Sequence, residues 1–323
     1  MLSKLMQEHI PTDIRKMRKN NFIEDLETKK LKNVEYVENG HGWADVTGCP
    51  LCGNNKNTIE LEVHRNQLLK CSNCEVRYHE KIPADFNDIY QVENYSPHTK
   101  GISTEDFNYR KERFGSERVK LLQKYCGDLQ NKSLLDVGCG IGDLLAAAQG
   151  AFKRCVGSEF SEHLRKFAHE KTKLNIYPNP LDSFPEKDFD VITAIDVIEH
   201  IPEPIPFMSA AVNLLNDNGH IMLYTPNYES ISIHVMQEFS NLISGTGHVI
   251  LYNHHSLQQL GEQVGLEVVH TETRGLDISS IASFLDYQNK SGSEFILNYG
   301  EELQAIINAS GAADYLRVIY KKK

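Results

Sequence analysis

A chain of 323 residues with 40% hydrophobic and 24% charged residues suits a folded protein of about two domains and argues against disorder. Its formal charge is −10, and the final three lysines form the one basic block, which argues against a nucleic-acid groove because such a groove needs a cationic face. No apolar run approaches the length of a membrane span, and the charged first twenty residues lack a signal-peptide core, so a cytoplasmic protein is predicted.

Residues 1–40 are predicted to form an N-terminal extension. Apolar residues such as Leu5, Met6 and Ile10 recur at loosely helical spacing. This spacing favours a surface or interface helix that Pro11 ends or kinks. A disordered tail is the alternative.

Four of the seven cysteines stand in two C-x-x-C pairs. CPLC contains Cys49 and Cys52, CSNC contains Cys71 and Cys74, and eighteen residues separate the pairs. The spacing predicts a zinc ribbon, in which each pair supplies two thiolates and the intervening segment folds as a hairpin. Four thiolates leave no open coordination position, so the expected Zn(2+) is structural; iron in the same sulfur cage and four unrelated free thiols are the alternatives.

The predicted zinc-ribbon module and its connector span residues 41–100. Acidic and basic residues are mixed around the cysteines, which favours a module that helps shape a pocket over one that binds nucleic acid. Tyr90 and Tyr95 in the connector are candidates for a lid over a bound ligand or for ordinary packing. The cysteines as a whole fit a reducing compartment better than a disulfide framework.

The stretch SLLDVGCGIGDLL, residues 133–145, reads as a strand, a tight glycine loop and a helix. Gly138, Gly140 and Gly142 alternate through the loop, and glycine tolerates positive φ and lets a ligand lie against the backbone. Asp136 precedes them, where a loop for a pyrophosphate would avoid negative charge and a loop for a cationic ligand would favour it. A small-molecule site is therefore predicted here, with a purely structural turn as the alternative.

An α/β pattern extends on both sides of this loop. A helix is predicted at 116–127, further strands at 154–159, 175–178, 189–196, 219–226 and 265–273, and two helical runs within 276–313 before a closing strand at 315–320. Glu159 ends the second strand, where an acid accepts hydrogen bonds from both ribose hydroxyls of a nucleoside. His254 and His255 are expected in the first turn of a helix capped by Ser256.

Taken in order, LLDVGCGIG, CVGSEFS, VIEH and TPN resemble the motifs of the class I S-adenosylmethionine-dependent methyltransferases. The resemblance covers about residues 115–275. It implies S-adenosylmethionine as cofactor and a Rossmann-like, seven-stranded sheet with an antiparallel last strand, in a methyltransferase domain over 101–323. The implied cofactor residues are Asp136, Gly138, Cys139, Gly140, Gly142, Glu159, Phe160, Leu181, Asp182 and Asp196.

The order of the modules also resembles sugar methyltransferases with a zinc-binding N-terminal domain, in which the E-H pair carries the catalytic base. By this resemblance His200 is the predicted base, Glu199 orients its ring or binds substrate, and His248 binds substrate or shares the base role. In quinone-biosynthesis O-methyltransferases of this branch, an acid three residues earlier helps to hold a divalent cation. Binding of Mg(2+) or zinc by Asp196, Glu199 and His200 is thus an open alternative, as are structural roles for His200 and His248.

The expected function is O-methylation of a sugar hydroxyl in bacterial surface-polysaccharide or nucleotide-sugar biosynthesis. The chain ends soon after the closing strand, which counts against the longer deoxysugar C-methyltransferases. The alternatives are a sugar C-methyltransferase, a metal-assisted quinone-type O-methyltransferase, an RNA methyltransferase and a non-enzymatic binding module. An RNA methyltransferase that acts on base amines would carry an N-P-P-(Y/F) sequence at the end of the fourth strand, and this chain has AIDVIEH there. The sequence identifies neither the acceptor sugar nor the oligomeric state.

Overall fold

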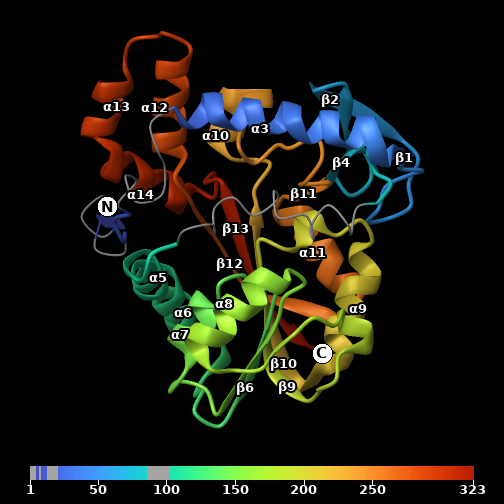
Figure 1. The fold of residues 1–323 in the computed structure, drawn as a ribbon, viewed down its shortest axis with the longest axis vertical. Coiled ribbons are helices and arrows are strands. Elements are labelled where there is room, and N and C mark those ends of the chain that lie inside the picture. The colour runs from blue at the N-terminus through green and yellow to red at the C-terminus, as the bar shows by residue number, and fades with distance from the viewer. Residues whose placement is uncertain (1–4, 7–8, 13–20, 86–101) are drawn as a thin grey trace.

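The computed structural model describes residues 5–6, 9–12, 21–85 and 102–323 (Figure 1). The connector with Tyr90 and Tyr95, and most of the first twenty residues, lie outside this description. A twisted central sheet with helices on both sides forms the lower part of the molecule. Above it lie a helical lobe near the C-terminal end of the chain and a smaller module near its N-terminal end.

The central sheet has seven strands in the order β12-β13-β10-β9-β6-β7-β8. Their bounds are β6 Ser133–Val137, β7 Arg154–Ser158, β8 Ile176–Tyr177, β9 Phe189–Ile195, β10 Leu215–Pro226, β12 Leu266–Arg274 and β13 Tyr315–Lys322. Within this sheet β13 is antiparallel to both of its neighbours, and the remaining pairs are parallel. The Rossmann-like methyltransferase fold is confirmed, and β10 begins at Leu215, earlier than the predicted residue 219.

Burial explains why the sequence folds this way. All five residues of β6 are buried, as expected for a central parallel strand that helices cover on both faces. The helices around the sheet are α5 Thr104–Arg110, α6 Ser116–Cys126, α7 Asp143–Ala148, α8 Glu162–Thr172, α9 Pro204–Leu214, α10 Ile231–Met236 and α11 His254–Gln263. Parallel strands bring their carboxyl ends to one edge of the sheet, here the upper edge in Figure 1, so residues just after β6, β7 and β9 gather there.

The start of α11 corrects one prediction. The helix cap is Asn253, whose Oδ1 accepts a hydrogen bond of 2.8 Å from the backbone N–H of Ser256. The Ser256 hydroxyl in turn accepts one of 2.9 Å from the N–H of Asn253, which completes a capping box. Ser256 is therefore the third helical residue rather than the cap, and His254 and His255 do lie in the first turn.

The segment before β13 holds three helices rather than the two predicted. They are α12 Asp277–Tyr287, α13 Ser293–Asn298 and α14 Gly300–Ser310. The extra break falls at Tyr299, whose φ of −114° and ψ of 18° depart from helical values. Asp277, fully buried at the start of α12, accepts hydrogen bonds from Gln304 on α14 and from the backbone of Asp314, and so ties this lobe to the sheet edge.

The N-terminal part consists of helix α3, Phe22–Tyr36, a π-helical turn at Val37–His41, and two small sheets. One sheet pairs β1 Trp43–Asp45 with β5 Lys81–Pro83, and the other holds β2 Asn57–Val63, β3 Asn66–Cys71, β4 Arg77–His79 and β11 Ile250–Leu251. The predicted hairpin between the cysteine pairs is β2–β3. Since β11 comes from beyond β10, this sheet is completed by the methyltransferase part of the chain.

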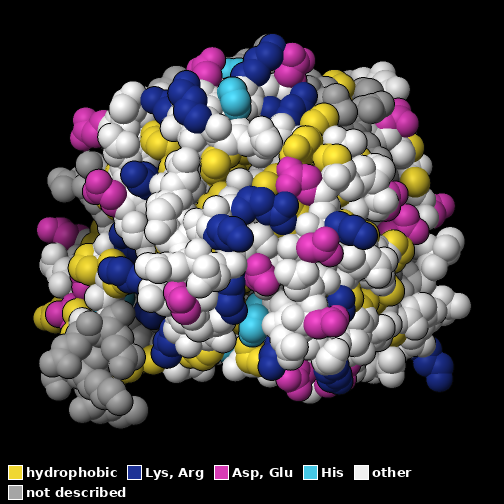
Figure 2. Space-filling view, turned by 90° about the horizontal axis from the view of Figure 1, so that it is seen from below, with side chains coloured by type: hydrophobic (Ala, Val, Ile, Leu, Met, Phe, Trp, Pro, Cys, Tyr) yellow, Lys and Arg dark blue, Asp and Glu magenta, His cyan; other side chains and the backbone are white. Residues whose placement is uncertain are grey.

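On the face seen from below in Figure 2, Lys and Arg side chains are interspersed with Asp and Glu side chains. This face therefore carries no continuous basic surface. In the described parts of the chain, no helix combines the length and the apolar character that crossing a bilayer requires.

Candidate functional site

The glycine loop after β6 is shaped for close approach. Gly138 and Gly140 have φ values of 64° and 54°, in the left-handed region that glycine adopts without strain. A Cβ on Gly138 would lie 2.5 Å from Cγ2 of Val197, so this glycine is required for packing against the end of β9. A Cβ on Gly140 would meet nothing within 4 Å, so this part of the loop borders open space in which a ligand could contact the backbone.

Two acids flank the loop. Asp136 is buried and accepts a 2.7 Å hydrogen bond from the Thr193 hydroxyl, and burial raises its pKa to about 7. The Glu159 carboxylate accepts hydrogen bonds from the N–H groups of Gly140 at 3.0 Å and Ser161 at 2.8 Å, and burial raises its pKa as well. The predicted ribose acceptor is thus held against the glycine loop.

The other residues predicted to bind S-adenosylmethionine differ in how exposed they are. The Cys139 side chain is buried in the core, and Gly142 precedes the first residue of α7 with a φ of 79°. Phe160 is 51% exposed directly after Glu159. Leu181 is buried and Asp182 exposed on a short 3-10 turn, Leu181–Ser183.

Sequence reasoning missed Arg118 on α6. It is buried, its guanidinium lies 4.0 Å from the Asp143 carboxylate, and its Nε has no hydrogen-bond partner among the described residues. Its charge lowers the pKa values of both Asp136 and Asp196, although burial dominates at each of these acids. Arg118 is therefore a cation among the acids at this edge of the sheet, and an arginine in an amphipathic helix gives no sequence signal for such a role.

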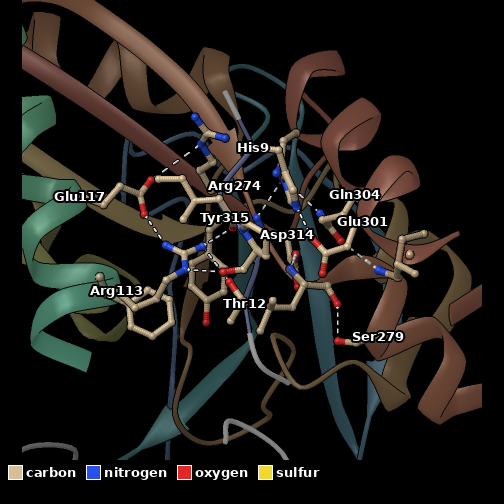
Figure 3. A pocket seen from close by; sticks show the side chains of 18 of the residues that line it. His9, Thr12, Arg113, Glu117, Arg274, Ser279, Glu301, Gln304, Asp314 and Tyr315 are labelled. Carbon is tan, nitrogen blue, oxygen red and sulfur yellow. Dashed lines mark hydrogen bonds and ion pairs between the residues drawn. The ribbon is translucent and has the colours of Figure 1, made fainter. Parts of the chain in front are cut away.

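A cavity of about 730 Å³ lies between the sheet edge, α5–α6 and the helical lobe (Figure 3). Asp196, Tyr224 and Tyr315 line it at the sheet, and the two tyrosine rings stack with centroids 4.7 Å apart. Asp196 has a φ of 55°, unusual for a residue with a side chain, and burial raises its pKa to about 6. Asp196 thus joins the predicted donor site to this cavity, because Val197 packs on Gly138.

The two predicted histidines lie together on the same edge. The His200 and His248 rings are 4.7 Å apart at an angle of 67°. His200 Nδ1 donates to the Gly247 carbonyl at 3.0 Å and His248 Nδ1 to the Leu242 carbonyl at 2.8 Å, which places the acceptor lone pair of each ring on Nε2. Burial, reinforced by His248, lowers the pKa of His200 to about 3, so the ring is neutral.

Glu199 lies beneath this pair and is fully buried. One carboxylate oxygen accepts a 2.9 Å hydrogen bond from Thr225, and the other lies 4.0 Å from His200 Nε2. The ligand atoms of Glu199, His200 and His248 lie within 4.8 Å of one another, so these three could hold a metal ion. Asp196, predicted as the third ligand, does not belong to this group, and neither histidine lines the cavity.

The four predicted cysteines form one cluster. Cys49 Sγ is 3.4 Å from Cys74 Sγ and Cys52 Sγ is 3.5 Å from Cys71 Sγ, and all four lie within 4.8 Å of one another. Zinc–sulfur bonds of about 2.3 Å put the sulfurs of a tetrahedral site roughly 3.8 Å apart, so the cluster fits a structural zinc ion. The backbone N–H of Asn73 also points at Cys71 Sγ, as expected around a metal-bound thiolate.

Backbone hydrogen bonds connect this cluster to the histidines. β4, which follows Cys74, pairs with β11, and the His79 N–H donates to the Val249 carbonyl at 3.1 Å. The Val249 N–H in turn donates to the Glu199 carbonyl at 2.9 Å. The cysteine cluster therefore supports the chain segment that carries His248.

Glu117 on α6 is the centre of an ion-pair network on the cavity wall. It contacts Arg317 at 2.7 Å, Arg113 at 2.8 Å and Arg274 at 4.0 Å, and Arg317 also contacts Glu272 at 3.1 Å. Burial opposes ionisation, but the charge and hydrogen bond of Arg317, and then Arg113, lower the pKa of Glu117 to about 2.

This depressed pKa predicts an acid-sensitive contribution to stability. A carboxyl group with a folded pKa of about 2 and an ordinary unfolded value stabilises the fold above about pH 5, by roughly 3 kcal/mol, and this contribution is lost as the pH falls toward 2. In urea titrations, the free energies of unfolding of wild type and Glu117→Gln should therefore converge between pH 6 and pH 3. A difference that stayed constant over this range would contradict the assignment.

The chain is similar to known methyltransferases in sequence and in fold. A family model described as a methyltransferase domain matches residues 107–271, more than half of the 323-residue chain. The ubiquinone biosynthesis O-methyltransferase of Yersinia enterocolitica is 32% identical over 124 residues, covering 36% of this chain and 51% of the relative. That of Hydrogenovibrio crunogenus is 25% identical over 118 residues, covering 34% and 48%. The chain thus spans about half the length of the curated relatives it matches.

Solved structures similar to the chain include magnesium protoporphyrin IX methyltransferase from Synechocystis with bound S-adenosylhomocysteine. It has a TM-score of 0.49 at 16% identity and covers 73% of this chain and 97% of that one. The cyclopropane synthase MmaA2 from Mycobacterium tuberculosis has a TM-score of 0.44 at 16% identity and covers 65% and 85%.

Proposed function

Because the chain belongs to the methyltransferase family whose domain its residues 107–271 match, we propose that it is an S-adenosylmethionine-dependent methyltransferase that O-methylates a sugar hydroxyl. When bound, S-adenosylmethionine supplies a methyl group on a positively charged sulfur. The observation that carries the proposal is the glycine loop between Asp136 and Glu159. Val197 packs on this loop, and the adjacent Asp196 lines a cavity large enough for a small acceptor.

The residues at the loop fit this donor. Gly140 leaves room against the backbone, and Glu159 carries carboxylate oxygens suited to two ribose hydroxyls. Arg118 is the cation suited to the donor's carboxylate, and Asp136 and Asp196 provide negative charge for a cationic donor.

His200 is the proposed base. A sugar hydroxyl is a weak nucleophile until a base begins to remove its proton, and orientation of the reacting groups contributes a large part of the remaining rate enhancement. The bond from Nδ1 to Gly247 fixes the His200 ring, so Nε2 is the atom that would accept the proton. Glu199 is 4.0 Å from His200 Nε2, and burial raises the pKa of this carboxyl group well above its usual range, so it is a neutral neighbour of the ring.

A quinone-type acceptor is the second candidate. The relatives named ubiquinone biosynthesis O-methyltransferase favour it, and Glu199, His200 and His248 form a group that could hold a divalent cation. Sugar C-methylation is the third candidate function. The match to the methyltransferase domain model does not distinguish an oxygen from a carbon as the methylated atom. An RNA acceptor agrees poorly with the charge of −10.

A panel assay tests these alternatives. The protein would be incubated with S-adenosylmethionine and nucleotide sugars, free sugars, catechol-type quinone precursors and transfer RNA, and products would be identified by the mass of one added methyl group. The proposal predicts methylation of a sugar oxygen. Methylation of a quinone precursor, dependent on Mg(2+), would replace it.

Donor binding makes a separate prediction at Glu159. Replacing Glu159 with Ala removes the charged acceptor of the ribose hydrogen bonds. Loss of a single such bond, worth about 1.5–3 kcal/mol, already weakens binding roughly tenfold to a hundredfold, so S-adenosylhomocysteine should bind at least that much more weakly by calorimetry. Glu162→Ala is the matched control, because Glu162 is an exposed acid on α8 that pairs with Lys166. Equal affinities of the two variants would show that Glu159 does not hold the donor.

A further inference from the structure

The cavity beside Asp196 has two chemically different walls (Figure 3). On one side Arg113 and Arg274 point toward Glu117. On the other side Ser279, Glu301 and Gln304 extend from α12 and α14, while Asp314 and Tyr315 lie between the two walls. Residues 9–12 also line the cavity, where Arg113 donates to the carbonyls of Ile10 and Pro11 and His9 pairs with Glu301. A molecule beside this segment would meet guanidinium groups at one side and hydroxyl and carboxylate groups at the other.

Positive charge is in excess on the first wall. Five arginines line the cavity from α5, the turn after it, α6, β12 and β13, namely Arg110, Arg113, Arg118, Arg274 and Arg317. The acids that line this wall are Glu117 and Asp196, and Asp143 and Glu272 contact the arginines from outside the lining. The cavity as a whole is lined by five arginines and four acids, since Asp314 and Glu301 also line it, and Glu117 is shared among three of the arginines.

Apart from Arg118, which suits the carboxylate of S-adenosylmethionine, two of these arginines make no hydrogen bond with any described residue. Arg110 makes no ion pair with a described residue either. The contacts of Arg274 with Glu272 and Glu117 go through its Nε and are long, at 3.7 and 4.0 Å. The Nε atoms of both arginines are enclosed by protein, so a ligand would reach the terminal nitrogens that border the cavity. A guanidinium carries five N–H donors and no acceptor, so these terminal groups favour an anionic ligand.

The second wall suits hydroxyl groups. Ser279 and Glu301 offer a hydroxyl oxygen and a carboxylate that accept from sugar hydroxyls. The Ser279 hydroxyl itself donates to the Leu276 carbonyl at 2.8 Å, and one Glu301 oxygen pairs with His9. Gln304 is fixed by its hydrogen bonds to Asp277 at 3.0 Å and Asn308 at 3.1 Å, so this wall is positioned before a ligand binds.

Resting on the proposed function, we infer that the acceptor is an anionic sugar whose phosphate or carboxylate group binds Arg110 and Arg274 while its hydroxyls face α12 and α14. The anion pairs with the terminal guanidinium nitrogens of Arg110, which has no ion pair with a described residue, and of Arg274. The acceptor then lies against Asp196, at the boundary between the donor loop and the cavity. Glucose 1-phosphate carries a phosphate group and glucuronate carries a carboxylate group, so they represent the two kinds of anion. Neutral glucose has the same ring and no charged group.

The test uses the full chain saturated with S-adenosylhomocysteine, titrated calorimetrically with these three sugars. At least one anionic sugar should bind about tenfold more tightly than glucose, or tighter still. Comparing the affinities for glucose 1-phosphate and glucuronate then shows whether the site prefers a phosphate or a carboxylate. The double variant Arg110→Gln, Arg274→Gln should lose this preference. Arg65→Gln should keep it, because the Arg65 side chain is 83% exposed and lies outside the cavity lining.

Two results would overturn the inference while the proposed function survives. One is equal affinity for glucose and both anionic sugars in protein that binds S-adenosylhomocysteine. The other is a preference for the anion that persists in a double variant whose circular dichroism and donor affinity match those of wild type. Failure of wild type to bind S-adenosylhomocysteine at all would instead refute the proposed function, and this inference with it.

Discussion

Cys71→Ser is expected to lose the bound zinc and with it most of the folded N-terminal module. Structural zinc sites contribute on the order of 10 kcal/mol to folding, comparable to the entire stability of a typical domain. The cysteine cluster has little core of its own, and its buried members pack in the same hydrophobic cluster as Leu135 and Val137 of the central sheet. Losing the ion should therefore destabilise more than the ribbon.

The effect should reach the histidine pair, because β4 pairs with β11 and Val249 hydrogen-bonds Glu199. We expect about one zinc ion per wild-type chain by mass spectrometry, and a melting temperature lowered by roughly 10 °C or more in Cys71→Ser. Cys126→Ser, which changes a buried cysteine outside the cluster, should retain the zinc. Metal-free wild-type protein with an unchanged melting temperature would contradict a structural zinc site.

Much of the fold follows from local patterns in the sequence. The apolar run before Gly138 predicts β6, and the alternation of large apolar residues over Tyr315–Tyr320 predicts β13. Both strands are buried because of the apolar residues that they themselves contain. The break between α13 and α14 was not predicted, since no proline marks it. The two-residue strand β11 was also missed, because Ile250 and Leu251 form a strand only where β4 offers an edge.

The candidate site also has parts that local sequence patterns predict and parts that they do not. The closeness of the Glu159 carboxylate to Gly140 could be predicted, because both residues belong to short motifs with fixed spacing, and their binding of S-adenosylmethionine stays a prediction. The arginine-rich cavity could not, because Arg110 and Arg274 lie far apart in the sequence and nothing local marks either of them. The pairing of His200 with His248 likewise depends on how the segment after β10 returns to the sheet edge.

Replacing His200 with Ala should lower kcat about a hundredfold to ten-thousandfold, while S-adenosylhomocysteine binds as it does to wild type. The reason is that His200 would act on the acceptor proton alone, whereas we propose that Gly140 and Glu159 hold S-adenosylmethionine. His248→Ala is the informative comparison, because its ring packs on His200 and its loss should perturb the base without removing it.

Asp196 is the competing base, since it lines the cavity and His200 does not. A base must be deprotonated to act, so its activity falls as the pH drops below its pKa. With His200 as the base, kcat should stay level from pH 8 to pH 5, because burial holds the pKa of this ring near 3. With Asp196 as the base, whose pKa is about 6, kcat would fall tenfold for each pH unit below that value, and Asp196→Asn would carry the loss that we expect for His200→Ala.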